Sequence, residues 1–183
     1  MQYRTHNISQ ITEALDGQRI KVAGWVENIR DHGGVMFIDL RDHYGVLQIV
    51  MNNEELLKGI GKEFCISVEG NLRKRTPDSY NPKIITGTVE LVAESIEILG
   101  AVTERLPFDV QTAAETKEEL RLKYRFLDLR NRELHDRIVL RSEVIAYMRE
   151  VMRSLGFIEI NTPILTASSP EGARDYLVPS RCL

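Results

Sequence analysis

Five strand-length stretches fill the first hundred residues, and their order constrains the fold more than any other feature of the sequence. Each stretch alternates apolar with polar residues or is rich in β-branched residues, and turn-forming residues bound it. A short helix capped by Asn53 is predicted at residues 53–58, between the third and fourth stretches. Five short strands with one helix in this position are typical of an OB-fold barrel, whereas an SH3-like barrel would lack that helix. We predict strands at residues 19–29, 35–41, 46–51, 64–73 and 88–99.

The pattern changes after the fifth predicted strand. Residues 100–110 show no clear period and contain Pro107, which indicates a linker. Residues 113–124 predict a short, highly charged helix. Asn131 can cap a longer helix that carries one apolar stripe and runs to about Leu155, and the glycine that follows is a natural stop.

The segment after the long helix reads as the entry into a larger sheet. Residues 157–160 have the alternation of a strand, and Pro163 follows them. No further strands of such a sheet follow within the 183 residues, so we expect a second domain that is only begun. Residues 157–181 would lack their strand partners, and we expect them to be the least stable part of the chain.

Composition and charge exclude several classes of protein. An apolar fraction of 43% is sufficient for a packed core, and a net charge of −3 excludes a strongly basic nucleic-acid coat, so any nucleic-acid contact must come from a local patch. The cysteines, Cys65 and Cys182, lack the spacing of metal ligands and indicate a reducing compartment. No stretch has the length of a membrane span, and the first residues lack the apolar core of a signal peptide. We therefore expect a cytoplasmic protein without a metal site.

The second and third predicted strands each have one uniformly apolar face, which should point into the barrel. Phe37 and Gln48 then lie on the outer face, where OB folds bind oligonucleotides. An aromatic ring there can stack on a base, and a glutamine can read a base edge as donor and acceptor. The alternative is that a neighbouring loop covers Phe37 and that Gln48 is merely solvated. The six inward residues are Met36, Ile38, Leu40, Leu47, Ile49 and Met51.

Basic residues lie near the same face. Arg30 follows the first predicted strand, and Arg73 begins a basic run at the end of the fourth. Such residues can position a nucleic acid through its phosphates, although a charged strand end is often only a solvated rim. Glu90, in the fifth strand, repels phosphate but can accept a hydrogen bond from a base, so it suits recognition more than affinity.

Taken together, several stretches resemble the bacterial-type aspartyl-tRNA synthetases of class II. They are GWVENIRDHGGVMFIDLRD at 24–42, GVLQIV at 45–50, NPKIITGTVEL at 81–91, LRLKYRFLDLR at 120–130, and the later FIEINTPIL and SPEGARDYLVPSR. The resemblance covers residues 1–181. It implies an OB-fold anticodon-binding domain at residues 1–100, a hinge at 101–130 and, at 131–183, the first helix and strand of a truncated class II α+β catalytic domain.

The resemblance also implies roles for residues of the OB fold. Phe37 matches the aromatic residue that stacks on the central uridine of the anticodon, and Gln48 matches a residue that reads its neighbourhood. Arg30 and Arg73 match basic residues near the anticodon loop, and Glu90 matches the acid that contacts the first anticodon base.

Three further residues are assigned by resemblance. His32 matches a position where histidine accompanies enzymes that charge both tRNA-Asp and tRNA-Asn. Glu171 matches the carboxylate that receives the α-ammonium of aspartate, although on its own it reads as an exposed loop residue. Pro163 lies in the dimerisation motif, for which an ordinary amphipathic helix packed on its own domain is the alternative.

The full-length family is a homodimer that activates aspartate with ATP and Mg²⁺ and transfers it to tRNA-Asp. Its second and third motifs, which grip the phosphates of ATP, do not occur in these 183 residues. We therefore expect this chain to bind tRNA without a cofactor and not to aminoacylate it. The alternatives are a free-standing OB protein that binds single strands and a nonfunctional truncation product.

Overall fold

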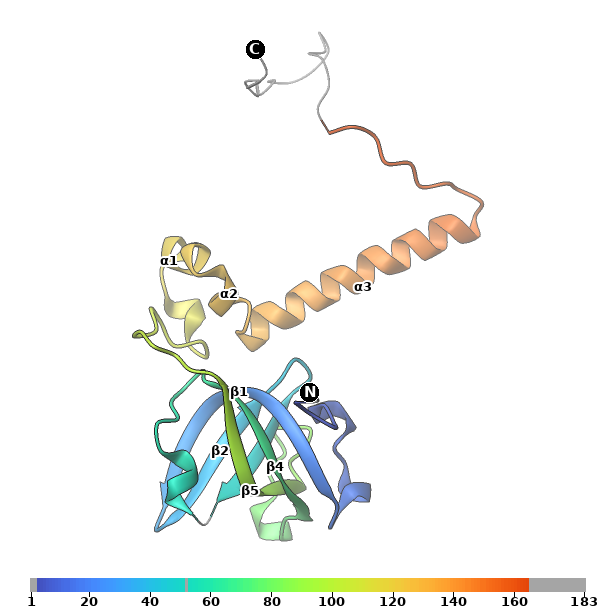
Figure 1. Cartoon of the computed structure of the whole chain (residues 1–183). Helices are drawn as coiled ribbons and strands as arrows, with labels where there is room; N and C mark the ends of the chain where they lie inside the picture. The colour runs from blue at the N-terminus through green and yellow to red at the C-terminus, as the bar shows by residue number, and fades with distance from the viewer. Residues whose placement is uncertain (1–2, 52, 165–183) are drawn as a thin grey trace. The chain divides into compact units, whose positions relative to one another are not determined.

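The computed structural model describes residues 3–51 and 53–164. The chain divides into two compact units, Met1–Leu106 and Pro107–Leu183. The first unit holds all five strands and the second holds the α-helices (Figure 1).

The strands of the first unit form a closed barrel. Their order is β1-β2-β3-β5-β4, and the barrel closes because β1 pairs with both β2 and β4. All neighbours are antiparallel except β3 and β5, which pair in parallel. The predicted OB fold is confirmed, with strand ends that differ from the predicted ones by at most three residues. The strands are β1 (Arg19–His32), β2 (Val35–Arg41), β3 (Val46–Met51), β4 (Cys65–Lys74) and β5 (Val89–Gly100).

The core of this unit lies inside the barrel, where the alternation of β2 and β3 places it. Five of the six residues predicted to point inward are fully buried, and Met36 is partly buried against the same core. The N-terminal segment adds Ile8 and Ile11, which are 1% and 4% exposed. Ile8 is held in place because its backbone N donates to Asp42 Oδ2 at 2.9 Å.

Short 3-10 helices connect and flank these strands. The predicted helix after β3 is η3 (Glu54–Leu57), and Asn53 caps it by accepting a hydrogen bond from Glu55 N at 3.0 Å. The other 3-10 helices of the unit are η1 (Ile8–Gln10), η2 (Glu13–Leu15) and η4 (Pro77–Ser79). The sequence pattern did not predict η1 and η2, because these short helices depend on contacts with the barrel and have no apolar period of their own.

A two-residue turn joins β1 to β2. His32 pairs with Val35, so only Gly33 and Gly34 lie between the strands, with φ of 64° and 94°. This conformation favours glycine and matches the twist of the strands. Asp31 Oδ1 accepts a hydrogen bond from Gly34 N at 3.1 Å and so fixes the turn.

The second unit begins with short helices around a buried carboxylate. The predicted helix at 113–124 consists of two pieces, η5 (Ala113–Glu115) and α1 (Glu118–Lys123), and α2 (Arg125–Asp128) follows. Asp128 is fully buried, and its oxygens accept hydrogen bonds from Arg121 at 2.8 Å and Arg125 at 2.5 Å. These charge-assisted bonds tie α1 to α2.

The long helix α3 (Arg132–Ser154) begins and ends where the sequence predicts. Asn131 caps it by accepting a hydrogen bond from Leu134 N at 3.2 Å, and Gly156 ends it with φ of 86°. The strand predicted after it is wrong for the described residues, because 157–164 form none. A strand needs a neighbour for its backbone hydrogen bonds, and no described residue pairs with this segment.

Candidate nucleic-acid interface

A row of polar residues crosses all five strands on the outer face of the barrel. Asn28 pairs with Asp39, Asp39 pairs with Gln48, and Arg73 pairs with Glu90. Gln48 and Glu90 come next to each other because β3 and β5 pair in parallel through the residues that follow them, Ile49 and Leu91. We call these five residues the cross-strand row.

Hydrogen bonds connect neighbours within the row. Gln48 Nε2 donates to Glu90 Oε2 at 3.2 Å, and Arg73 Nε donates to Glu90 Oε1 at 2.7 Å. Arg73 Nη2 lies 2.7 Å from the same oxygen in an ion pair. At the other end, Asn28 Nδ2 donates to Asp39 Oδ2 at 3.4 Å. The predicted site residues Gln48, Arg73 and Glu90, which come from three strands, are therefore in direct contact.

Phe37, Arg30 and His32 lie beside the row. Phe37 and Arg30 are cross-strand partners, and Arg30 Nη2 reaches Asp39 Oδ1 at 2.6 Å. The rings of His32 and Phe37 meet edge to face, with centroids 5.6 Å apart and planes at 71°. Phe37 is partly buried, so it is neither fully covered by a loop nor fully free. The structure brings the six predicted OB-fold site residues together on one face.

The acids and bases of this face lie at different depths. The side chains of Arg30 and Arg73 are 46% and 56% exposed, whereas those of Asp39 and Glu90 are 17% and 10% exposed. In both pairs the arginine is therefore more exposed than the carboxylate that it contacts.

Arg75 is a buried cation at the edge of the same face. Its side chain is 3% exposed; Nε donates to Val89 O at 3.0 Å and lies 3.7 Å from Glu90 Oε2. Nη1 donates to Ser79 O at 3.3 Å, but Nη2 has no hydrogen-bond partner among the described residues. Burial lowers the pKa of the guanidinium from its usual value, although the carboxylates of Glu90 and Asp39 oppose that shift. It remains protonated at neutral pH.

Sequence reasoning missed Arg75 and Asp39 as site residues. Arg75 stood within a basic run that has the character of a solvated rim, and nothing in the run distinguished a buried arginine from an exposed one. Asp39 shares the outward face of β2 with Phe37, so alternation could have found it. Its hydrogen bonds with Arg30 and Asn28 depend on the pairing of β1 with β2, including a bulge between Val26 and Asn28.

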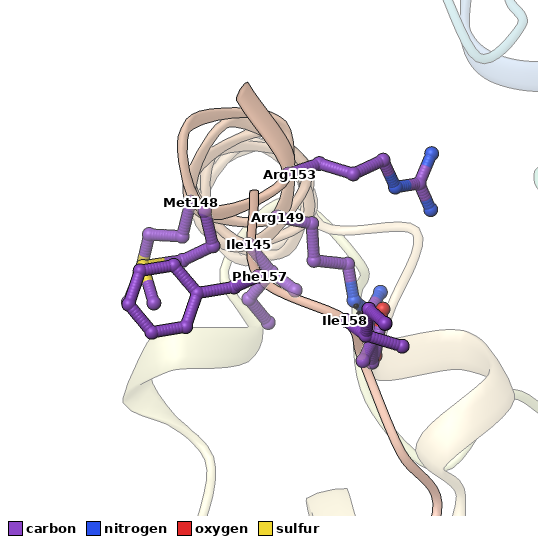
Figure 2. A pocket seen from close by; sticks show the side chains of 8 residues that line it. Ile145, Met148, Arg149, Arg153, Phe157 and Ile158 are labelled. Carbon is purple, nitrogen blue, oxygen red and sulfur yellow. Dashed lines mark hydrogen bonds and ion pairs between the residues drawn. The ribbon is translucent and has the colours of Figure 1, made fainter. Parts of the chain in front are cut away.

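A second surface feature is an apolar groove on α3. The chain turns back after Gly156, with Phe157 N donating to Met152 O at 3.1 Å. Figure 2 shows Met148 and Phe157 together on one side of the helix, with Arg153 pointing away. No residue of α3 is buried within the described part of the chain. The groove is lined by Ile145, Met148, Arg149, Met152, Arg153, Phe157, Ile158 and Glu159.

Two predicted residues lie near or beyond the end of the described chain. Pro163 is exposed and belongs to no helix or strand, and Glu171 lies outside the described residues. Among residues 3–51 and 53–164, no three His, Cys, Asp or Glu side chains gather as metal ligands would. The described part thus offers no cluster of carboxylates that fits Mg²⁺. None of the described helices is long and apolar enough to span a membrane.

Two family profiles match the chain. The first, described as an OB-fold nucleic acid binding domain, covers residues 20–99. The second, described as the class II tRNA synthetases (D, K and N), covers residues 117–183. The first profile agrees with the five-stranded barrel, and the second covers α1, α2 and α3.

Individual relatives agree with these profiles. Over 183 residues the chain is 48% identical to the aspartate–tRNA(Asp/Asn) ligase of Paracoccus denitrificans, covering 98% of this chain and 31% of that protein. The ligase of the same name from Agrobacterium fabrum is also 48% identical, with 98% and 31% covered. The chain therefore spans about a third of the length of these curated relatives.

Solved structures of synthetases share the fold. Asparaginyl-tRNA synthetase from Pyrococcus horikoshii, complexed with asparaginyl-adenylate, matches with a TM-score of 0.77 and 25% identity over 91% of this chain and 38% of that one. Aspartyl-tRNA synthetase from Entamoeba histolytica matches in fold, with a TM-score of 0.75 and 20% identity over 90% of this chain and 41% of that one. These structures share the fold, and the two profiles with the curated relatives identify the chain as a member of the class II aspartyl-tRNA synthetase family that corresponds to the N-terminal portion of its enzymes.

Proposed function

We propose that residues 1–100 recognise the anticodon of tRNA, that 101–130 form a hinge, and that 131–183 begin a class II catalytic domain. The observation that carries this proposal is the cross-strand row with Phe37 beside it. This row crosses the outer face of β2 and β3, where OB folds bind oligonucleotides. Together with Phe37 and Arg30 beside it, the row combines an aromatic ring, a base-reading amide and exposed guanidinium groups on one surface.

Each predicted site residue has a chemical role in this proposal. Phe37 stacks on the central uridine of the anticodon, an interaction of about 1–3 kcal/mol. Gln48 reads a base edge, and its bond to Glu90 fixes which way the amide points. Arg30 and Arg73 contact phosphates, which positions the RNA without reading it. Glu90 accepts a hydrogen bond from the first anticodon base.

We propose tRNA-Asp as the partner and tRNA-Asn as a second one. The curated relatives carry both tRNAs in their names, and His32 stands beside the stacking ring. A histidine at this position is predicted to tolerate a change in the third anticodon base. It would do so from the last position of β1, next to Phe37 rather than in the cross-strand row.

A titration with RNA tests the anticodon proposal. The 183-residue chain is titrated with a tRNA-Asp transcript and with one whose central anticodon uridine is replaced, each at two salt concentrations. We expect a preference of about tenfold for the natural anticodon, which Phe37→Ala removes. Equal and strongly salt-dependent binding of both transcripts would contradict the proposal, because only phosphate attraction would remain, as for a nonspecific single-strand binder.

For the whole protein we propose the family's reaction in the cytoplasm: aspartate activation with ATP and Mg²⁺, then transfer to tRNA. Glu171 would receive the α-ammonium of aspartate, and α3 with Pro163 would form a homodimer contact. The 183-residue chain by itself would bind tRNA without charging it, since its sequence lacks the family's phosphate-gripping motifs. Aspartate-dependent ATP–pyrophosphate exchange by this chain would contradict that part of the proposal.

A further inference from the structure

We propose that Asp39 is a positioning residue of the anticodon interface, whose carboxylate holds the guanidinium of Arg30 beside Phe37 so that RNA meets it in one orientation. This inference rests on the proposed function. It concerns how the interface discriminates between anticodons, and it gives a role to a carboxylate that the six predicted site residues leave out.

The contact between Asp39 and Arg30 is short and directional. Arg30 Nη2 donates to Asp39 Oδ1 at 2.6 Å, which is short even for a charge-assisted hydrogen bond. Arg30 is the cross-strand partner of Phe37, and its side chain extends along the sheet to reach Asp39. The guanidinium thus lies next to the ring that is proposed to stack on the central base.

Asp39 is itself fixed on several sides. Its other oxygen accepts a hydrogen bond from Asn28 at 3.4 Å. Its strand, β2, pairs with β1 on one side and β3 on the other, so its backbone cannot shift freely. With only 17% of its side chain exposed, Asp39 lies below Arg30. It can therefore act on RNA through Arg30 rather than by contact of its own.

A carboxylate in this place has an electrostatic cost. Its negative charge repels the phosphates of a bound RNA and reduces the attraction that Arg30 provides. Without it, the long arginine side chain would be free to adopt many rotamers. Asp39 therefore lowers the affinity for any RNA and raises the preference for the correct anticodon. A residue with only a structural role would not produce these opposite effects.

The test uses Asp39→Asn, which keeps the shape of the side chain and removes its charge. The dissociation constants of the 183-residue chain are measured for the tRNA-Asp transcript and for the one with a replaced central uridine. Asp39→Asn is expected to bind the replaced transcript at least as tightly as wild type does, and to reduce the preference for the natural anticodon from about tenfold to about twofold. In an Arg30→Ala background, the same change is expected to alter that preference less than twofold.

Three controls make the result specific. Glu97→Gln removes an equal charge from β5, seven residues from Glu90 and roughly 20 Å away, and should leave the preference unchanged. Asp39→Glu keeps the charge but displaces the carboxylate by one methylene, and should lower the preference without changing the salt dependence. Fluorescence of the single tryptophan, Trp25, verifies that each barrel is folded.

The possible outcomes distinguish a failure of this inference from a failure of the proposed function. An unchanged preference in Asp39→Asn, or an equal loss in the presence and absence of Arg30, overturns the inference and leaves the proposed function in place. A wild-type chain that shows no preference at all overturns the proposed function and the inference with it.

Discussion

Arg41 and Glu63 form a buried ion pair in the first unit. Arg41 Nη2 lies 2.8 Å from Glu63 Oε1 and 3.0 Å from Oε2, and the two residues are 7% and 6% exposed. Arg41 ends β2, whereas Glu63 lies in the turn before β4 and adopts a φ of 62°. The backbone N of Glu63 also donates to Val26 O at 2.7 Å. The pair therefore joins three segments of the barrel that are distant in sequence.

Removing one partner of this pair should destabilise the barrel strongly. Glu63→Ala leaves a buried guanidinium whose ion pair with Glu27 is longer, at 3.7 Å, and is expected to lower the free energy of unfolding by about 3 kcal/mol. Trp25 fluorescence during urea unfolding measures this change. Lys58→Ala breaks the exposed pair with Glu55 and should cost less than about 0.5 kcal/mol. Equal effects of the two substitutions would show that burial of the first pair does not matter.

Much of the barrel could be predicted from local sequence, because a strand's alternation depends only on which face is buried. The inward residues Ile38 and Ile49 follow from that period. Arg41 is an exception to this alternation. It occupies an outward-facing position of β2, yet Glu63 and the chain around Glu63 bury its side chain. No local pattern encodes which distant segment covers a strand end.

The sequence predicted which residues belong to the candidate site but not which of them contact one another. Phe37 and Gln48 could be placed on one face because they lie on consecutive strands. The contact between Gln48 and Glu90 depends on the parallel pairing of β3 with β5, which are separated in sequence by β4. The resemblance to the synthetase family identified Glu90 as a site residue, but not the side chains that fix its position. Only the folded structure shows that Glu90 accepts hydrogen bonds from Arg73 and Gln48.

Two glycines of the barrel offer a matched test of close backbone packing. A Cβ added at Gly70 would lie 2.0 Å from Val92 O, whereas one added at Gly100 would meet nothing closer than Cys65 Cβ at 3.7 Å. Gly70→Ala forces the backbones of β4 and β5 apart and should cost about 1–3 kcal/mol of unfolding free energy. Gly100→Ala should leave stability nearly unchanged in the same urea titration. A tolerated Gly70→Ala would mean that the strands can separate at little cost.

Arg75 should show opposite effects on stability and on recognition. Its Nη2 has no hydrogen-bond partner among the described residues, and Glu90 retains Arg73 and Gln48 without it. Burying a guanidinium with an unpartnered nitrogen costs free energy, and an apolar side chain of similar volume avoids that cost, while Glu90 keeps its other two partners and is not left as an unpaired charge. Arg75→Met is therefore expected to unfold at the same or a higher urea concentration, while the preference for the natural anticodon falls. A large loss of stability would show that Arg75 mainly supports the fold.

His32 should control tolerance of the third anticodon base. Wild type is expected to bind tRNA-Asp and tRNA-Asn transcripts within about threefold of each other, a difference below 1 kcal/mol. His32→Leu should weaken binding of the tRNA-Asn transcript and leave tRNA-Asp binding nearly unchanged. A strong preference of wild type for tRNA-Asp, or an equal loss for both transcripts, would contradict this role. The equal loss would instead point to a general support of the Phe37 ring, which His32 contacts edge to face.

The apolar face of α3 should drive self-association, if the homodimer proposed for the whole protein forms through this helix. Ile145, Met148 and Met152 recur at helical spacing, are 38%, 60% and 44% exposed, and flank the groove beside Phe157. Isologous burial of such a face removes apolar surface from both copies at once. Ile145→Asp places a charge in the contact and is expected to shift the chain from dimer to monomer in sedimentation equilibrium. Tyr147→Asp adds the same charge about 200° around the helix and should leave the dimer intact. A wild-type chain that stays monomeric at all concentrations, or a dimer that Ile145→Asp does not weaken, would show that this face is not the contact between copies.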